Sequence, residues 1–562
     1  MPRGIRSGAL VLAVALGACG SDPRDAAPRR PHVLVIVADD LGYTDLGLLG
    51  SEIRTPNLDA LARQGLLLTR FYVSPACSPT RAMLLSGADP HRAGLGTMVG
   101  EQSTRQEGQP GYEGVLGERV VSLAALLQEA GYHTSMAGKW HLGGGPGQGP
   151  ERRGFERSFG LVGGGASHFS DATTLLRSDG PAAYLEDGEA VSGLPDDFYS
   201  SDAYTDRLIG FMREGLEAGR PLFGYAAYTS PHWPLQAPDA RLEGYRGVYD
   251  AGYEALLRRR AEAAAAAGLV PGDIPPPALL PFVPAWDGLD PDERAFQARV
   301  MEVYAAMVEN LDHNVGRLLA FLADAGHLED TLVLFFSDNG AEGNPIGNIS
   351  GNAAWIAERF DNRLENVGRR GSYVYLGPGW AQATTGPFRH FKAFASEGGV
   401  RVPAIVRAPA RGFAPGGRRS DAVVSVLDLA PTLLELAGVS PPGATWRGRP
   451  VAPLEGISMG PLLRGEKETI RGPADVLGWE LFGRRAVLKG EWKLSWTWPP
   501  YGPGEWELFH LASDPGERTD RSGTEPEKRA ELLAEWQAYA RRNGVVLPER
   551  DSSYALEVSP PR

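Results

Sequence analysis

The chain has almost no cysteine: two residues, Cys19 and Cys77, in 562. So small a number excludes a framework of structural disulfides. Basic residues are also scarce relative to acidic ones, since 56 Lys and Arg stand against 69 Asp and Glu, a net charge of −13. This balance argues against nucleic acid as a partner, although it allows an anionic ligand wherever the local charge is positive.

Long apolar runs are missing as well. The apolar segment 9–18 is too short to cross a membrane, which takes about 20 residues. It follows Arg3 and Arg6, the pattern of a secretory signal, and residues 16–19 read LGAC. This ending resembles a bacterial lipobox, so we expect a signal peptide over 1–18, a lipidated tether over 19–30, and membrane attachment through a lipid on Cys19. An ordinary signal cleaved nearby is the alternative.

Export and lipidation together would determine the chemical environment of the second cysteine, Cys77. The mature protein would lie in the bacterial periplasm or at the cell surface, an oxidising environment. Cys77 would then be a lone thiol there, which is a liability unless the side chain is buried or has chemistry.

The rest of the sequence alternates between strand and helix patterns. Residues 32–38 (HVLVIVA) and 331–336 (TLVLFF) are apolar runs typical of strands buried on both faces of a parallel sheet. Apolar residues recur at helical spacing over 291–326. The sequence therefore predicts an α/β domain over 31–465, with a large, mixed, mostly parallel sheet flanked by helices. Shorter elements predicted on the same grounds are strands at 221–228 and 402–406 and helices at 57–65, 122–131 and 428–438.

Two kinds of segment interrupt or follow this pattern. Residues 235–290 and 341–386 are long and rich in Gly, Pro and aromatics, and we expect them to shape a substrate site. After residue 466 the pattern changes to short strands at 485–488, 492–498 and 506–510 and a helix at 525–542. This pattern predicts a second, smaller domain over 466–562, an antiparallel sheet with one packed helix.

Both of the fully apolar strands end in oxygen-bearing side chains. Asp39 and Asp40 follow the first strand, and Asp338 and Asn339 follow the second. Each pair alone is most often a turn or a cap. If the strands are neighbours, however, four hard ligands converge at the carboxyl edge of the sheet, which suits Ca²⁺ or Mg²⁺.

A short helix is predicted after Cys77. Ser78 is a good N-cap, Pro79 suits the first turn, and Gly87 ends the helix. Cys77 would then lie just outside a helix N-terminus, where an anion is favoured. On these grounds alone a buried structural cysteine is the simpler interpretation.

Several motifs together resemble one family. Residues 77–81 (CSPTR) resemble the Cys-x-Pro-x-Arg signature of the sulfatases, members of the alkaline phosphatase superfamily. The segments 138–143 (GKWHLG), 231–235 (PHWPL) and 397–399 (EGG) match further sulfatase motifs in the same order. The resemblance extends from residue 32 to the end of the chain, and its departures, Glu156 and Ser396, touch no catalytic group.

The resemblance implies a mechanism. Cys77 would be oxidised to formylglycine (3-oxoalanine) by a maturation enzyme, and the aldehyde hydrate would attack sulfur. Arg81, Lys139 and Lys392 would supply positive charge to the sulfate. His141 would deprotonate the second hydroxyl, and either His232 or Lys392 would protonate the leaving alcohol. The metal, Ca²⁺ or possibly Mg²⁺, would be bound by Asp39, Asp40, Asp338 and Asn339.

The implied substrate is a small sulfate ester, and residues 371–382 look most like those of bacterial arylsulfatases, which favours aryl or alkyl sulfates. Tyr373, Tyr375 and Trp380 would wall an apolar pocket or pack the scaffold. The alternatives are a phosphonate monoester or phosphodiester hydrolase with the same formylglycine site, a sulfatase acting on a sulfated carbohydrate, and a catalytically silent binding lipoprotein. The other histidines are expected to be structural or at the surface (His133, His168, His313, His327 and His510), and the role of His390 is open.

Overall fold

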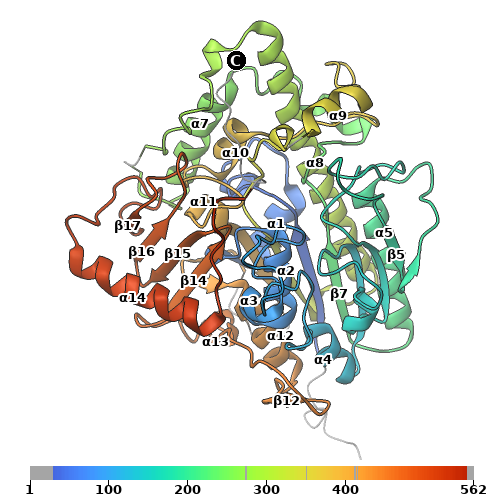
Figure 1. Ribbon diagram of the computed structural model, residues 1–562. Coiled ribbons are helices and arrows are strands. Elements are labelled where there is room, and N and C mark those ends of the chain that lie inside the picture. Colours follow the sequence, from blue (N-terminus) through green and yellow to red (C-terminus); the bar gives the residue numbers. More distant parts are fainter. Residues whose placement is uncertain (1–29, 273–274, 350, 410–412, 414–415, 553–562) are drawn as a thin grey trace, which may run out of the picture. The chain divides into compact units, whose positions relative to one another are not determined.

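The computed structural model describes residues 30–272, 275–349, 351–409, 413 and 416–552. The predicted signal peptide and the lipidation site Cys19 lie outside these residues. From Pro31 onward the chain forms one compact unit, shown in Figure 1. Among the described residues, no helix combines the length and the apolar character needed to span a membrane.

A large mixed sheet organises this unit, as the sequence predicts. Its strand order is β10-β2-β9-β8-β1-β7-β3-β4-β5-β6, with β11 paired to β2. The strands from β8 through β4 run parallel, whereas β9 is antiparallel to both β8 and β2. The bounds are β1 His32–Ala38, β2 Leu66–Tyr72, β3 His133–Lys139, β4 Arg157–Leu161, β5 Tyr184–Glu186, β6 Glu189–Ala190, β7 Leu222–Ala227, β8 Thr331–Ser337, β9 Arg401–Arg407, β10 Arg418–Ser420 and β11 Val424–Ser425.

Helices cover both faces of the sheet. Alternate residues of β1 enter two separate cores: Leu34 and Ile36 pack on one side, and Val33 and Val35 on the other. This double burial explains why β1 is apolar at nearly every position. The first core is completed by α1 (Pro56–Gln64), α5 (Ser200–Glu217) and α8 (Pro291–Asp324), and the second by α2 (Cys77–Ser86), α4 (Leu123–Glu129) and α12 (Leu429–Ala437). The remaining helices are α3 Pro90–Ala93, α6 Asp239–Leu242, α7 Gly252–Ala266, α9 Asn352–Arg359, α10 Pro378–Thr385, α11 Glu397–Val400, α13 Gly460–Leu463 and α14 Pro526–Asn543.

The C-terminal region forms the small antiparallel sheet that the sequence predicts, in orange to red in Figure 1. Its strands are β14 (Val476–Leu481), β15 (Arg484–Lys489), β16 (Trp492–Trp496) and β17 (Trp506–His510), in that order. One face packs against α14 through a shared apolar cluster. Because both sheets belong to one compact unit, the domain boundary at residues 465 and 466 stays a prediction.

A buried histidine joins the small sheet to the large one. His91 in α3 bonds Asp89 through Nδ1 (2.8 Å) and Glu480 of β14 through Nε2 (3.1 Å), and the Tyr539 hydroxyl of α14 donates to Asp89 (2.7 Å). Burial opposes the charged form of His91, but the two carboxylate hydrogen bonds outweigh it and raise its pKa to about 9. The imidazolium is therefore the stable form when the protein is folded.

This pairing predicts a pH-dependent stability. Because the pKa of His91 rises from an unfolded value near 6.5 to about 9, its contribution is complete below pH 6.5 and is lost as the pH rises to 9. The difference in unfolding free energy between wild type and His91→Gln should shrink by about 3 kcal/mol between pH 6 and pH 9.5. Denaturant melts at both pH values measure it.

His510→Gln is the control, because the His510 ring bonds Ser513 rather than a carboxylate. Its effect on stability should be similar at the two pH values. A constant difference between wild type and His91→Gln across this range would contradict the ionic role of His91.

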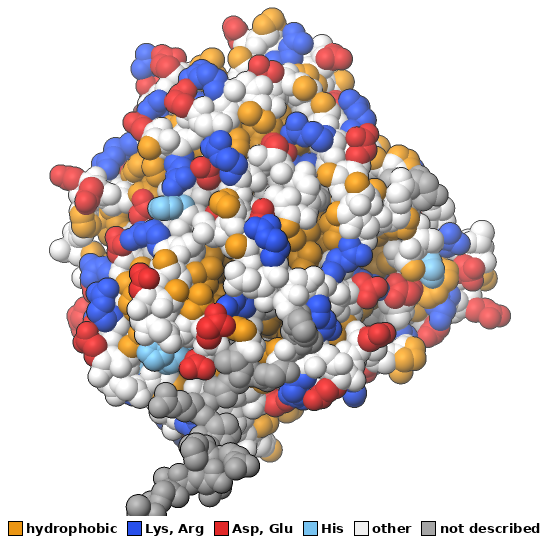
Figure 2. Space-filling model, turned by 180° about the vertical axis from the view of Figure 1, so that it is seen from behind, with side chains coloured by type: hydrophobic (Ala, Val, Ile, Leu, Met, Phe, Trp, Pro, Cys, Tyr) orange, Lys and Arg blue, Asp and Glu red, His pale blue; other side chains and the backbone are white. Residues whose placement is uncertain are grey.

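Charged groups are mixed over the surface. On the face shown in Figure 2, positive and negative side chains are interspersed, and hydrophobic side chains are scattered among them. The described residues on this face therefore form no broad patch of one sign.

Candidate active site

The acidic residues predicted to bind a metal do converge. Strands β1 and β8 are parallel neighbours, with Ala38 opposite Ser337, so the residues that follow them meet at one edge of the sheet. Asn339 Nδ2 donates to Asp40 Oδ1 (2.6 Å), and the Asp40 amide lies 3.4 Å from Asp338 Oδ1. All four side chains are buried. Residues about 300 positions apart thus form one cluster.

The cluster fits a hard divalent cation. Asp39 Oδ1 and Asn339 Oδ1 are buried and have no hydrogen-bond partner among the described residues. A buried oxygen without a partner is costly, and a cation would satisfy both atoms. Ligand atoms of Asp39, Asp40 and His232 also lie within 4.8 Å of one another. The oxygen-rich donor set matches the preference of Ca²⁺ or Mg²⁺.

Three buried cations surround these acids. Lys139, at the end of β3, lies 2.7 Å from Asp39, and Arg81 of α2 lies 2.7 Å from Asp338. Lys392 Nζ lies 2.8 Å from Asp40. Each carboxylate therefore has its own positive partner at full burial, where electrostatic interactions are least screened.

Burial controls the protonation of the acids. It raises the pKa of Asp40 to about 6, with Glu342 and Asp338 adding to the rise and Lys392 opposing it. Burial likewise raises the pKa values of Asp39 and Asp338. A divalent cation among them would stabilise the ionised forms.

The helix that carries Cys77 begins two residues earlier than predicted. Helix α2 starts at Cys77 itself, and its N-cap is Ala76, whose backbone is extended. The prediction that Ser78 is the N-cap is therefore wrong: its hydroxyl instead accepts a hydrogen bond from the Val99 amide (3.2 Å). Gly87 ends the helix in a left-handed conformation, as predicted.

Cys77 faces a histidine. Its Sγ lies 3.3 Å from His141 Nδ1. Burial raises the pKa of the Cys77 thiol, although Lys139 and Lys392 oppose the rise. Burial also lowers the pKa of His141 well below its usual value, and the same lysines lower it further. A neutral thiol beside a neutral imidazole is therefore favoured, and this is not the thiolate–imidazolium pair of a cysteine nucleophile.

His232 completes the group of candidate catalytic residues. Its Nδ1 donates to the carbonyl of Trp233 (2.6 Å), and its Nε2 lies 3.6 Å from Asp40 Oδ2. His168, expected to be structural, bonds the His232 carbonyl through Nε2 (3.0 Å) and Ser200 through Nδ1 (2.7 Å). His168 therefore supports the backbone of His232.

These groups open into a cavity of about 490 Å³. Cys77, His141, His232 and Lys392 line it, whereas Arg81, Lys139 and the acidic cluster lie buried beneath. The structure thus brings all ten predicted site residues together, in two layers.

The walls of the cavity differ from the prediction. They come from residues 98–101, 143–144, 161–165, 174–176 and 178–183, and within the described part of the chain no residue of 235–290 or 341–386 lines the cavity. Of the two roles left open for the three aromatics, the structure shows packing in the scaffold: Trp380 packs against Tyr253 and Tyr373 against Trp233. Tyr375 belongs to the same apolar cluster as Tyr373.

Comparison with known proteins identifies the family. The family model described as Sulfatase matches residues 31–439. The chain belongs to the sulfatase family. Its members are sulfuric ester hydrolases, and so is this protein.

Individual relatives agree with this assignment. An uncharacterised sulfatase of Schizosaccharomyces pombe is 42% identical over 540 residues, which cover 94% of this chain and 96% of the relative. The arylsulfatase of Klebsiella aerogenes is 40% identical, over 80% of this chain and 96% of the relative. The crystal structure of Ps i-CgsB in complex with k-i-k-neocarrahexaose has the same fold, with a TM-score of 0.65, 24% identity and coverage of 93% and 95% of the two chains.

The sulfatase has one buried acid at the site that the sequence analysis missed. Glu342 Oε2 lies 3.2 Å from Lys392 Nζ, and its other oxygen accepts from the amide and the side chain of Asn344. Glu342 thus holds the Lys392 ammonium between two carboxylates. The position of Glu342 shortly after Asn339 could have indicated a role at the site, but no local sequence pattern distinguishes it from a surface glutamate.

Proposed function

We propose that this sulfatase hydrolyses aryl or alkyl sulfate monoesters to a phenol or alcohol and inorganic sulfate, with residue 77 as nucleophile after conversion of Cys77 to formylglycine. The observation that carries the proposal is the 3.3 Å approach of Cys77 Sγ to His141 Nδ1 at a cavity floor backed by three cations. The raised thiol pKa disfavours an unmodified cysteine nucleophile.

Two further groups would complete this chemistry. A formylglycine hydrate at residue 77 would supply one hydroxyl to attack sulfur and another for release of sulfate, and a divalent cation would supply fixed positive charge. Asp39, Asp40, Asp338 and Asn339 would hold the cation. We propose Ca²⁺, with Mg²⁺ as the alternative, because each of these residues offers an oxygen ligand. The maturation enzyme that modifies Cys77 is the partner that the proposal requires.

Two different residues of the chain would carry out the two proton transfers. His141 Nδ1 lies where it can accept a proton from a hydroxyl on residue 77. In a neutral His232, the hydrogen bond to the Trp233 carbonyl keeps the proton on Nδ1, so Nε2 is an acceptor. We therefore assign the proton donor for the leaving alcohol to Lys392, which lines the cavity.

Apolar side chains favour an aryl or alkyl leaving group over a carbohydrate. Met98, Val99, Leu175 and Trp233 line the cavity beside the proposed nucleophile. These residues offer contact area to an aromatic ring but few hydrogen bonds to a sugar. The arylsulfatase name of the Klebsiella relative agrees with this choice.

We further propose that the enzyme acts outside the cytoplasm, anchored by a lipid on Cys19 after removal of residues 1–18. The sequence of residues 16–19 is the support for this proposal. Metabolic labelling with a fatty-acid probe, compared between wild type and Cys19→Ala, tests the anchor.

Initial rates on matched esters test the function. We expect the mature enzyme to hydrolyse 4-nitrophenyl sulfate with a kcat/KM at least about 100-fold above that for a phenyl phosphonate monoester or for glucose 6-sulfate. Only the aryl sulfate has both a sulfate group for the cationic floor and an aromatic ring for the apolar wall. Negligible turnover of the aryl sulfate with rapid turnover of the phosphonate would replace this proposal by the phosphonate hydrolase alternative.

A further inference from the structure

The catalytic cavity carries opposite charges at its two ends. Its floor holds Lys392 above Arg81 and Lys139, all buried. Its remaining charged lining residues, among those described, are Glu101 and Asp179. Asp179 is exposed and Glu101 is half-buried, so these carboxylates lie toward the solvent, away from the buried floor. A bound ester would have its sulfate at the positive end and its alcohol group near the negative end.

The wall between the two ends is apolar and well packed. Met98, Leu175 and Trp233 line the cavity and also belong to one buried cluster with Tyr373 and Ile356. A packed wall of this kind resists repacking around a differently charged group.

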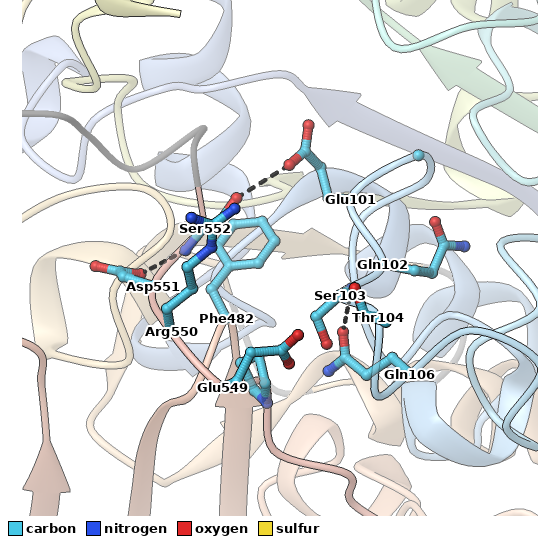
Figure 3. Close-up of a pocket in the computed structure, with 12 residues that line it drawn as sticks. Glu101, Gln102, Ser103, Thr104, Gln106, Phe482, Glu549, Arg550, Asp551 and Ser552 are labelled. Atoms are coloured by element: carbon cyan, nitrogen blue, oxygen red, sulfur yellow. Dashed lines mark hydrogen bonds between the residues drawn. The ribbon is translucent and has the colours of Figure 1, made fainter.

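Both rim carboxylates are held in place. The Ser552 hydroxyl donates to Glu101 Oε2 (3.0 Å), an interaction drawn in Figure 3. Asp179 Oδ2 accepts from the Leu176 amide (3.1 Å). Burial raises the pKa of Glu101, and the charge of Asp179 raises it further, which agrees with two carboxylates facing a shared space.

A second hollow adjoins the rim. Glu101 and Gly100 line both the catalytic cavity and this neighbouring hollow of about 280 Å³. Glu549 lines only the second hollow, on the C-terminal segment that Figure 3 shows opposite Glu101. Glu549 therefore belongs to the adjoining hollow and not to the cavity, and it serves as a matched control.

We propose that Glu101 and Asp179 make the cavity select leaving groups by charge. Esters whose alcohol ends in an ammonium group are favoured, neutral esters are intermediate, and esters with a second anionic group are rejected. The inference rests on the proposed aryl sulfatase function and adds its charge specificity. The reason is that an anion at the rim meets two fixed carboxylates, whereas an ammonium is attracted by both.

Three phenyl sulfates of equal length test the inference. They carry 2-aminoethyl, propyl or carboxymethyl at the 4-position, and release of inorganic sulfate is measured at pH 8 and low salt. For wild type we expect kcat/KM for the ammonium ester to exceed that for the carboxylate ester by at least about tenfold. The ratio should fall to within about threefold in Glu101→Gln/Asp179→Asn, whereas Glu549→Gln should keep the wild-type ratio.

Each outcome is decisive. A wild-type ratio near one, or an unchanged ratio in the double variant, would overturn the inference while leaving the sulfatase function intact. Failure to hydrolyse any of the three sulfates, with turnover of a phosphonate ester, would overturn the proposed function instead. If the double variant does not fold, the single variants and the salt dependence of the wild-type ratio decide. A ratio that comes from charge must fall between about 20 and about 300 mM salt, because dissolved ions screen the rim carboxylates more strongly as the ionic strength rises.

Discussion

Cys77→Ala is expected to lower kcat/KM for an aryl sulfate by at least about 1,000-fold, because it removes the nucleophile. The same mature wild-type protein should yield a peptide containing residue 77 that is about 18 Da lighter than its sequence predicts, the mass change from cysteine to formylglycine. Initial rates and intact-peptide mass spectrometry, with and without coexpression of a maturation enzyme, measure both effects.

Ser78→Ala is the matched control for this variant. Ser78 lies in the same buried helix and bonds the Val99 amide, but it does not line the cavity. The control should lose some stability and little activity, less than about threefold. Full activity in protein whose residue 77 remains an unmodified thiol would refute the formylglycine assignment.

Removal of the divalent metal is expected to lower the rate at least about 100-fold and to lower Tm, with both restored by added Ca²⁺. Metal binding to the folded protein would stabilise it by mass action, and the proposed metal would supply charge at the sulfate. Asp338→Asn should abolish the Ca²⁺-dependent rise in Tm. It should also destabilise the fold, because it removes the nearer of the two carboxylates that pair with the buried Arg81.

Asp312→Asn separates these two effects. Asp312 is a buried carboxylate that bonds the Asn57 and Leu58 amides, outside the acidic cluster. This variant should lower Tm but keep the Ca²⁺-dependent rise. A wild-type enzyme that remains fully active after chelation, with no shift of Tm on adding Ca²⁺, would contradict the metal site.

Much of the fold was predictable because its signals are local. The strands β1 and β8 bury both faces, so nearly every residue in them is apolar, and α8 repeats its apolar side chains at helical spacing. The acids that follow the two strands could be recognised in the sequence because they directly follow these apolar runs. Their convergence needed only that the two strands be neighbours, and the structure meets that condition.

Where the predictions failed, the cause is contact between distant segments. Ser78 has the chemistry of an N-cap, but its hydroxyl bonds the Val99 amide, 21 positions away, and Ala76 is the N-cap instead. For Tyr373 and Trp380 the sequence left two roles open, a pocket wall or scaffold packing, and their contacts with other aromatic rings place both in the scaffold. Local propensity cannot report which partner a side chain finds.

The sequence by itself determined the position of the proposed nucleophile, the acidic ends of two strands and the alternation of strands and helices, since each depends on residues close together in the chain. Only the tertiary structure decided the ion pairs and the cavity walls. Lys392 reaches Asp40 across 352 positions, and Glu101 and Asp179 meet at one rim only after folding. Such pairings depend on the path of the whole backbone, which no local pattern encodes.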